Sequence, residues 1–450
     1  MKKLLLSLFL SSFLVMGCLK SPVPNPVENI PPETHLFVEG RTDTVGGRQM
    51  IYWWGNDPDG YVVGYYIKID TSDWVWTTST ESLIIFHSES TVIEHRFQAV
   101  AVDNEGAQDP TPAEVVIPTI NTPPTIAFVY NSLPQDTTFP VATFYWEAHD
   151  DDGDQTISGY LWKLDTDSTW NVIDDGTVNH ITIRDIEPGE RTFTVKAFDE
   201  AGAISPDSAT YTWVVKPVRG HILLVDDESG DMAGRFYRSI LDSMGIDTTQ
   251  YSIWPVERGL PYSPYDIAAI VNDLGFDLII WYTGNQDNHI TGVQGALATY
   301  IDNGKKLLLI SQNIINQNNP TNMFVTQYLH VDTVVAVDKN LFPSGNPVYP
   351  ETLITSTVAG YPDTLSAITV VPYIDAFEPD SEATALYRLP EAHDTTALWP
   401  GTPAVAIRYP SVENGDAQVI FFAIQLDKMD KRRNVYDLLR HIIRDEFGTR

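Results

Sequence analysis

The residues best placed for chemistry come directly after three apolar runs in the C-terminal half of the chain. The runs at 221–225, 276–282 and 306–310 have the character of buried strands. Ligands of open α/β sheets bind beyond the carboxyl ends of the strands. We therefore predict a pocket formed by the residues that follow these runs, namely Asp226, Asp227, Thr283, Gly284, Asn285, Ser311, Gln312 and Asn313.

Ser311 is the member of this group that could act as a nucleophile. A serine hydroxyl needs a base within hydrogen-bond reach and an oxyanion hole. The segment 310–313 lacks the glycines that flank the serine in a G-x-S-x-G turn. A polar strand end that forms a turn is the alternative. No sequence pattern pairs Ser311 with a histidine, because the candidates are scattered: His289, His330, His393 and His441.

Asp226 and Asp227 offer a different chemistry. Adjacent carboxylates at a strand end can bind a metal ion or accept a phosphoryl group. No lysine and no Thr or Ser partner stands at a convincing strand end for phosphoryl transfer. The pair is therefore kept, with Ser311, as a candidate for the hydrolysis of an amide, an ester or a sugar.

The elements that would position these residues alternate between strands and helices. Helices are expected at 236–245, 293–303 and 432–447, and a further strand at 417–424. Strands that are apolar throughout belong to parallel sheets covered on both faces, so we expect a doubly wound α/β domain. Residues 335–410 fit the alternation poorly and are expected to form a β-rich insertion or an extension of the sheet.

The strand ends at 222–227, 280–284 and 306–311 resemble those of the class I glutamine amidotransferase-like superfamily. The resemblance covers residues 219–447 and implies a flavodoxin-like sheet. Active members of that superfamily use a cysteine on a sharp turn after a strand, assisted by histidine and glutamate. The only cysteine of this chain is Cys18. The resemblance therefore implies a domain that has no thiol nucleophile.

Cys18 lies where a bacterial lipoprotein carries its lipid. Two lysines and an apolar run at 4–15 precede it, which is the form of an export signal too short to span a bilayer. The segment Val15-Met16-Gly17-Cys18 resembles the lipobox of signal peptidase II substrates. It implies a signal peptide at 1–17 and a lipid on Cys18. The five prolines from Ser21 to Pro32 indicate a stiff, extended tether at 18–32. Leu19 stands in place of aspartate and favours anchoring in the outer membrane, on its periplasmic or its outer face. The alternative to a lipoprotein signal is an ordinary signal peptide.

One sequence unit occurs twice between the tether and the C-terminal half. Residues 51–60 correspond to 144–153, residues 64–70 to 159–165, and residues 97–110 to 193–206. Short alternating runs bounded by Asp, Gly and Pro predict antiparallel strands. Residues 33–118 and 124–216 are therefore expected to be two all-β sandwiches that resemble fibronectin type III and immunoglobulin-like modules. Trp53 and Trp146 are their candidate core aromatics.

Aspartates cluster in corresponding loops of the two copies. Carboxylate oxygens can form a cage for calcium, which takes about six to eight oxygen ligands. Asp and Gly also favour tight turns because they tolerate the backbone angles. Calcium is thus the one candidate cofactor, and plain turns without a metal are the alternative. The candidate ligands are Asp57, Asp59, Asp103, Asp150, Asp152 and Asp199.

The charge balance excludes one class of partner. The chain has 28 Lys and Arg against 60 Asp and Glu, which gives a formal charge of -32. Nucleic acid is therefore an unsuitable partner, since no basic stripe can neutralise phosphates. We expect an envelope lipoprotein, held to the membrane by its lipid, that displays a non-catalytic amidotransferase-like domain to a protein or glycan partner. The alternative is a surface hydrolase that uses Ser311 or the Asp226-Asp227 pair.

Overall fold

The structure is a computed structural model that describes residues 28–38, 48–86, 92–230, 232–284, 289–312, 314–317, 322–335, 353–369, 371, 374–391, 399–429 and 433–449. Cys18, the export signal and the tether up to residue 27 lie outside these residues. The chain divides into two compact units: Met1–Pro123 with the loops Asp150–Thr156 and Asp199–Ile204, and Pro124–His149 with Ile157–Phe198 and Ser205–Arg450. Within the described ranges, no helix combines the length and the apolar character needed to cross a bilayer.

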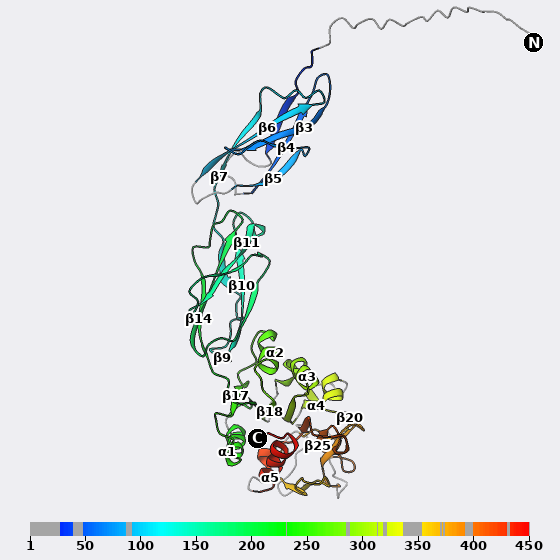
Figure 1. Cartoon of the computed structure of the whole chain (residues 1–450). Coiled ribbons are helices and arrows are strands. Elements are labelled where there is room, and N and C mark those ends of the chain that lie inside the picture. Colours follow the sequence, from blue (N-terminus) through cyan, green and yellow to red (C-terminus); the bar gives the residue numbers. More distant parts are fainter. Residues whose placement is uncertain are drawn as a thin grey trace, which may run out of the picture. The chain divides into compact units, whose positions relative to one another are not determined.

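The first repeat folds as two antiparallel sheets packed face to face (Figure 1). One sheet has the order β1 (Glu33–Val38), β2 (Arg48–Asn56) and β5 (Glu81–Ile85). The other has the order β4 (Val75–Thr77), β3 (Val62–Ile69), β6 (Ile93–Asp103) and β7 (Ala113–Thr119). Trp53 is 1% exposed, and its ring lies 5.4 Å from that of Phe97 across the sandwich. The predicted sandwich and its core tryptophan are confirmed.

The second repeat has the same sheet orders with one short strand added. The first sheet contains β13 (His180–Arg184), β10 (Val141–His149) and β8 (Thr125–Phe128). The second contains β12 (Asn171–Ile173), β11 (Ile157–Leu164), β14 (Gly189–Asp199), β15 (Ala209–Val215) and β9 (Thr137–Thr138); a single 3-10 turn, η1, spans Asp154–Thr156. Trp146 is 1% exposed and packs against Tyr160 at 5.2 Å between ring centroids, as expected.

In the described part of the C-terminal half, five parallel strands lie in one sheet. Their order is β17 (Tyr251–Pro255), β16 (Ile222–Asp227), β18 (Leu278–Thr283), β19 (Lys306–Ile310) and β26 (Val419–Phe422). The accompanying helices are α1 (Met232–Ser243), α2 (Pro264–Asn272), α3 (Gln294–Asp302), α4 (Ile314–Gln317) and α5 (Asn434–Arg440), with short helical segments at Ile290–Gly292, Phe324–Tyr328, Val412–Asn414, Leu426–Lys428 and His441–Glu446. The sequence did not predict β17 or α2, while the expected strands and the other main helices are present.

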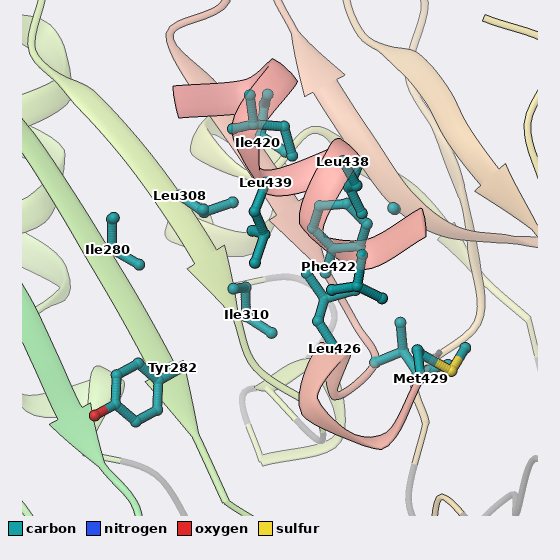
Figure 2. Packing of buried hydrophobic residues seen from close by; sticks show 14 of the residues in the cluster. Ile280, Tyr282, Leu308, Ile310, Ile420, Phe422, Leu426, Met429, Leu438 and Leu439 are labelled. Carbon is teal, nitrogen blue, oxygen red and sulfur yellow. The ribbon is translucent and has the colours of Figure 1, made fainter. Parts of the chain in front are cut away.

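The two faces of the parallel sheet bury different helices, because alternate residues of each strand point to opposite sides. Leu308, Ile310 and Phe422 lie on the side where Leu438 and Leu439 of α5 pack (Figure 2). α1 contributes to the same cluster. The alternate strand residues pack with α2 and α3 in a second cluster. Helices of this half therefore pack on both faces of the parallel sheet.

The described strands between Val331 and Tyr409 extend this sheet, which is the second of the two expectations for this region. Strands β25 (Ala404–Tyr409), β24 (Thr384–Arg388), β21 (Leu353–Thr355) and β22 (Thr364–Ser366) continue it from β26 in antiparallel pairings. A side pair of β20 (Val331–Val334) and β23 (Phe377–Pro379) joins at β25. Arg408 Nη2 contacts Glu446 Oε2 at 2.7 Å and thereby connects the extension to the last helical segment.

The second sandwich packs on the α/β domain within the second unit. The Thr143 hydroxyl on β10 donates to Asp266 Oδ1 on α2 at 2.6 Å, in a buried position. Phe139 belongs to the core cluster of α2 and α3, and its ring lies 6.1 Å from that of Phe276. Lys216 Nζ donates to the Ile253 carbonyl. This sandwich is therefore an integral neighbour of the α/β domain, which the sequence did not indicate.

Candidate functional site

The predicted pocket residues come together at the carboxyl ends of β16, β18 and β19. In the pairing of β16 with β18, Asp226 lies beside Tyr282 and Asp227 beside Thr283. The Thr283 hydroxyl donates to Ser311 Oγ over 3.2 Å, which connects β18 to β19. Asn285 and Asn313 lie outside the described residues. The others are all buried: Asp226, Asp227, Thr283, Gly284, Ser311 and Gln312.

Asp227 forms the most connected carboxylate of this group. Its Oδ1 lies 2.7 Å from Nδ1 of His289, and its Oδ2 accepts the His289 backbone N–H at 2.9 Å and the Trp281 indole N–H at 3.1 Å. Burial raises the pKa of Asp227 above its usual value, and the bonds from His289 and Trp281 offset this only in part. The His289 side chain is 35% exposed. The arrangement therefore holds an accessible imidazole in a fixed orientation, as acid–base chemistry requires.

Ser311 is placed differently from an active nucleophile. Its side chain is 0% exposed, and its hydroxyl accepts from Thr283 and makes a long contact of 3.4 Å with the Gln312 carbonyl. In the described part of the chain Ser311 has no histidine partner, since its hydroxyl contacts Thr283 and the Gln312 carbonyl, and His289 uses Nδ1 to contact Asp227. The remaining candidates lie elsewhere: His330 pairs with Asp380, His441 pairs with Asp445, and His393 falls outside the described residues.

Further acidic side chains surround these strand ends. Burial raises the pKa of Asp226, whose Oδ1 has no hydrogen-bond partner in the described part of the chain. Burial also raises the pKa of Glu228, and the nearby carboxylates of Asp427 and Asp226 add to this rise. Glu228 Oε2 accepts the Ala233 N–H at the start of α1. The described residues contain no group of three or more His, Cys, Asp or Glu side chains arranged to hold a metal ion.

Two buried polar residues at the same edge were not predicted from the sequence. Gln425 and Asp427 are 2% and 6% exposed and come shortly after β26, the last parallel strand. They follow an apolar run in the same way as the residues that were predicted. The rule applied to β16, β18 and β19 would have found them if it had been extended to β26.

The Asp-rich loops of the first sandwich hold the chain segment that enters it. Asp103 Oδ2 accepts from the Asn29 side-chain amide at 2.8 Å, and its Oδ1 accepts the Glu105 and Ala107 N–H groups. Asp59 Oδ2 accepts the Ile30 N–H at 3.1 Å. The predicted cluster is therefore engaged mainly with backbone and amide donors, as turns and a linker clamp require.

The second sandwich repeats this clamp. Asp199 Oδ2 accepts from the Asn121 amide at 2.6 Å, and Asp152 Oδ2 accepts the Thr122 N–H at 2.8 Å. Asp150 accepts the Asp152 N–H and the Thr156 hydroxyl. The clamped segments match in sequence, since Asn29-Ile30-Pro31-Pro32 and Asn121-Thr122-Pro123-Pro124 share an Asn-x-Pro-Pro pattern. Calcium binding at these loops stays a prediction.

A cavity of about 850 Å³ opens at the opposite, amino-terminal end of the parallel strands. Its lining includes Lys305 and Lys306. Lys305 Nζ pairs with Asp277 at 2.6 Å, and Lys306 Nζ donates to the Phe447 carbonyl. Both cations are thus engaged within the protein, and the cavity contains none of the predicted site residues.

Comparisons with known proteins give partial structural likenesses. No protein family matches the sequence, and no curated protein matches it. Among solved structures, fibronectin(III)-like modules of Clostridium thermocellum CbhA are 18% identical, covering 41% of this chain and 95% of that one, with a TM-score of 0.20. A two-domain fibronectin type III segment of chicken tenascin is 16% identical, covering 42% of this chain and 100% of that one, with a TM-score of 0.18. The PKD1 domain of Vibrio anguillarum Epp is 13% identical, covering 21% of this chain and 100% of that one, with a TM-score of 0.17.

Proposed function

We propose that the chain is a cell-envelope lipoprotein that acts by binding and display. Its two sandwiches present a non-catalytic α/β domain to a partner, and the lipid on Cys18 holds the protein to the outer membrane. The support for the anchor is the lipobox-like segment before Cys18 and the proline-rich stretch after it. Neither a metal nor another cofactor is part of this proposal.

The burial of Ser311 is the observation that supports a non-catalytic α/β domain. A nucleophile must reach its substrate and a base, but this hydroxyl is completely buried and hydrogen-bonded to Thr283. The chain offers no cysteine in its place, since Cys18 precedes both sandwiches. The end of β19 therefore fits a structural role.

The order of the parallel strands supports a flavodoxin-like, amidotransferase-like domain. Numbered along the chain, β16, β17, β18, β19 and β26 lie in the sheet as 2-1-3-4-5. This is the strand order of flavodoxin-like sheets, in which ligands bind at the carboxyl ends of the strands. The fold supports the class of domain only, because one fold serves many functions.

A surface hydrolase is the second candidate, and one observation favours it. His289 is held by the buried Asp227 carboxylate at 2.7 Å and remains partly exposed, as a general base would be. In that case the histidine would activate water or a substrate group, without any need for Ser311.

Turnover by the full chain distinguishes the two candidates. Ammonia release from glutamine and hydrolysis of chromogenic esters and glycosides are measured for the wild type, Ser311→Ala and His289→Ala. We expect no turnover above buffer for any of them. Turnover that disappears in either variant, with unchanged circular dichroism, would establish the hydrolase and overturn the display proposal.

A further inference from the structure

A surface groove of about 380 Å³ lies on the outer face of the β4-β3-β6-β7 sheet in the first sandwich. Its volume falls at the lower end of small-molecule sites, which span about 300–1,000 Å³. It therefore suits a small or narrow ligand rather than a folded domain. The lining residues are Tyr66, Trp74, Val100, Gln108, Asp109, Pro110 and Pro112.

Two aromatic rings, Tyr66 and Trp74, line the β3–β4 side of this groove, and Trp74 is 42% exposed. Trp76 is outside the lining and is 45% exposed. Trp76 contacts Tyr66 edge to face at 5.0 Å. It also lies directly on Gly64, where any Cβ would collide with the indole. The sequence thus leaves room for a large ring on the sheet surface, although exposed tryptophan contributes little to folding.

The charged groups around the groove are already partnered. Asp109, the one ionisable carboxylate in the lining, accepts from the Thr34 N–H and from the backbone and hydroxyl of Thr111. Lys68 Nζ lies 5.8 Å from the centre of the Trp74 ring. Together with the net charge of -32, the buried Asp109 anion disfavours an anionic ligand. The groove therefore offers flat apolar surface and the amide of Gln108, which can both donate and accept.

The second sandwich carries a lysine across the equivalent surface. Residue 196 corresponds to residue 100 in the repeat alignment, and here it is a lysine. Lys196 Nζ reaches across to the carbonyl oxygens of Ser205 and Pro206 at 3.1 and 3.3 Å. These residues correspond to Asp109 and Pro110 of the first copy. Lys196 of the second sandwich thus extends over the surface that Val100 leaves open in the first sandwich.

Two aromatic residues at or beside the groove of the first sandwich are aliphatic in the second. Tyr66 corresponds to Leu161 and Trp76 to Val172, both by sequence and by their cross-strand pairing. Trp74 and its lysine contact are retained, as Trp170 and Lys163 at 4.9 Å. The fold therefore does not need the open groove or its additional rings.

We propose that the groove of the first sandwich binds a neutral oligosaccharide, with one pyranose ring stacked on Trp74 and its hydroxyls hydrogen-bonded to Gln108. The axial C–H bonds of a sugar ring form a flat apolar face that suits an exposed indole, and its hydroxyls suit an amide. This inference rests on the proposed binding role and gives it a ligand class and a site. It does not depend on whether the α/β domain is catalytic.

A proline-rich peptide is the competing ligand, because aromatic grooves also bind polyproline II helices. Such grooves hold proline rings in slots between aromatic side chains. Here Tyr66 and Trp76 contact each other edge to face, which fills the slot between them. The geometry leaves Trp74 as a single stacking surface and so favours the sugar.

The test is affinity electrophoresis of the full, detergent-solubilised chain through gels that contain neutral or anionic polysaccharides, followed by calorimetry with the best oligosaccharide and with a polyproline peptide. We expect retardation by at least one neutral polysaccharide. Trp74→Ala should weaken binding by about tenfold or more, as removal of a tryptophan anchor does. Val100→Lys, which copies the lysine of the second sandwich, should weaken it similarly, and Gln108→Ala by a smaller factor.

Trp170→Ala is the matched control, because it removes the corresponding indole from the second sandwich; its binding should equal that of the wild type. Gln108 is exposed, so Gln108→Ala keeps the test valid even if Val100→Lys lowers the thermal midpoint. No retardation by any neutral polysaccharide, equal binding by Trp74→Ala, or tighter binding of the peptide at this site would overturn the inference. Turnover in the assay described above would overturn the display role alone.

Discussion

The two sandwiches share one frame and differ on the outer face of one sheet. Asp103 and Asp199 clamp the incoming chain in the same way, and both copies bury a tryptophan at the same position. Val100 leaves the groove open in the first copy, whereas Lys196, at the matching position, extends over the equivalent surface in the second. The repeated residues therefore determine the fold, whereas residues on the outer face of this sheet determine what each copy contacts.

The other sheet of each sandwich, β1-β2-β5 in the first and β13-β10-β8 in the second, also differs in what it contacts. In the second sandwich, Thr143 on β10 contacts α2 of the α/β domain. In the first, the corresponding sheet exposes Leu83 by 40% and Ile85 by 49%. The second copy is thus built into the α/β unit, whereas the first presents surface to solvent.

The largest effect is expected from the core tryptophans. Trp146→Ala and Trp53→Ala each remove a fully buried ring and should cost about 3–5 kcal/mol in the sandwich concerned. In calorimetry of the full chain, Trp146→Ala should lower the transition of the unit that contains the α/β domain. Trp53→Ala should lower a separate transition. A shift of the same transition by both variants would contradict this division.

A smaller effect is expected at the contact between the second sandwich and α2. Thr143→Ala leaves the buried Asp266 carboxylate without its hydroxyl donor and should cost about 1–3 kcal/mol. The readout is the thermal midpoint of the same unit. Thr210→Ala, at an exposed threonine on β15, serves as the control and should leave the midpoint nearly unchanged. Equal behaviour of the two variants would argue against a buried contact.

Asp103 of the first copy and Asp150 of the second should respond to acid with opposite signs. Burial acts to raise the pKa of Asp103, but bonds from Asn29 and the loop N–H groups outweigh it and leave the pKa below 3.8. Burial raises the pKa of Asp150 above 3.8. The stabilisation by Asp103 is therefore present above pH 3.8 and lost as the pH falls through its folded pKa. Protonation of Asp150 instead favours the folded state as the pH falls.

Thermal midpoints at pH 7 and pH 3 measure this contrast. The gap between the wild type and Asp103→Ala should shrink on acidification, whereas the gap between the wild type and Asp150→Ala should grow. Gaps that move in the same direction would contradict the opposite pKa shifts of these two carboxyl groups.

The smallest effect is expected from calcium. If the loop carboxylates serve turns and linkers, millimolar calcium or EDTA should leave both transitions of the full chain in place. A magnesium buffer of equal ionic strength controls for electrostatic screening. A calcium-specific rise of a midpoint that Asp103→Ala or Asp199→Ala removes would instead establish a metal site.

The sequence was sufficient wherever a pattern is local. The apolar runs identified β16, β18 and β19, and the repeat identified both sandwiches and their tryptophans. Strand β17 was missed because its five residues, Tyr251–Pro255, contain no long apolar run. Helix α2 was also missed, although Ser263 accepts the Tyr265 N–H and Pro264 starts the helix, a readable capping signal.

Contacts between distant residues could not be predicted in this way. The pairing of Asp227 with His289 depends on where the chain returns after β18, and the burial of Ser311 depends on the packing of β19 between its neighbours. The groove could not be predicted from the sequence, because it depends on how aligned positions of the two copies are placed once folded. The effect of Lys196 on this surface follows only when its reach to Ser205 is known.

Covalent labelling of Ser311 is the most direct test of display without catalysis. The full chain is treated with a serine-directed fluorophosphonate, and the peptide containing residue 311 is examined by mass spectrometry, with an active serine hydrolase as the positive control. We predict that this peptide remains unmodified in the folded protein. Stoichiometric modification of Ser311 would show an accessible, activated nucleophile and contradict the account.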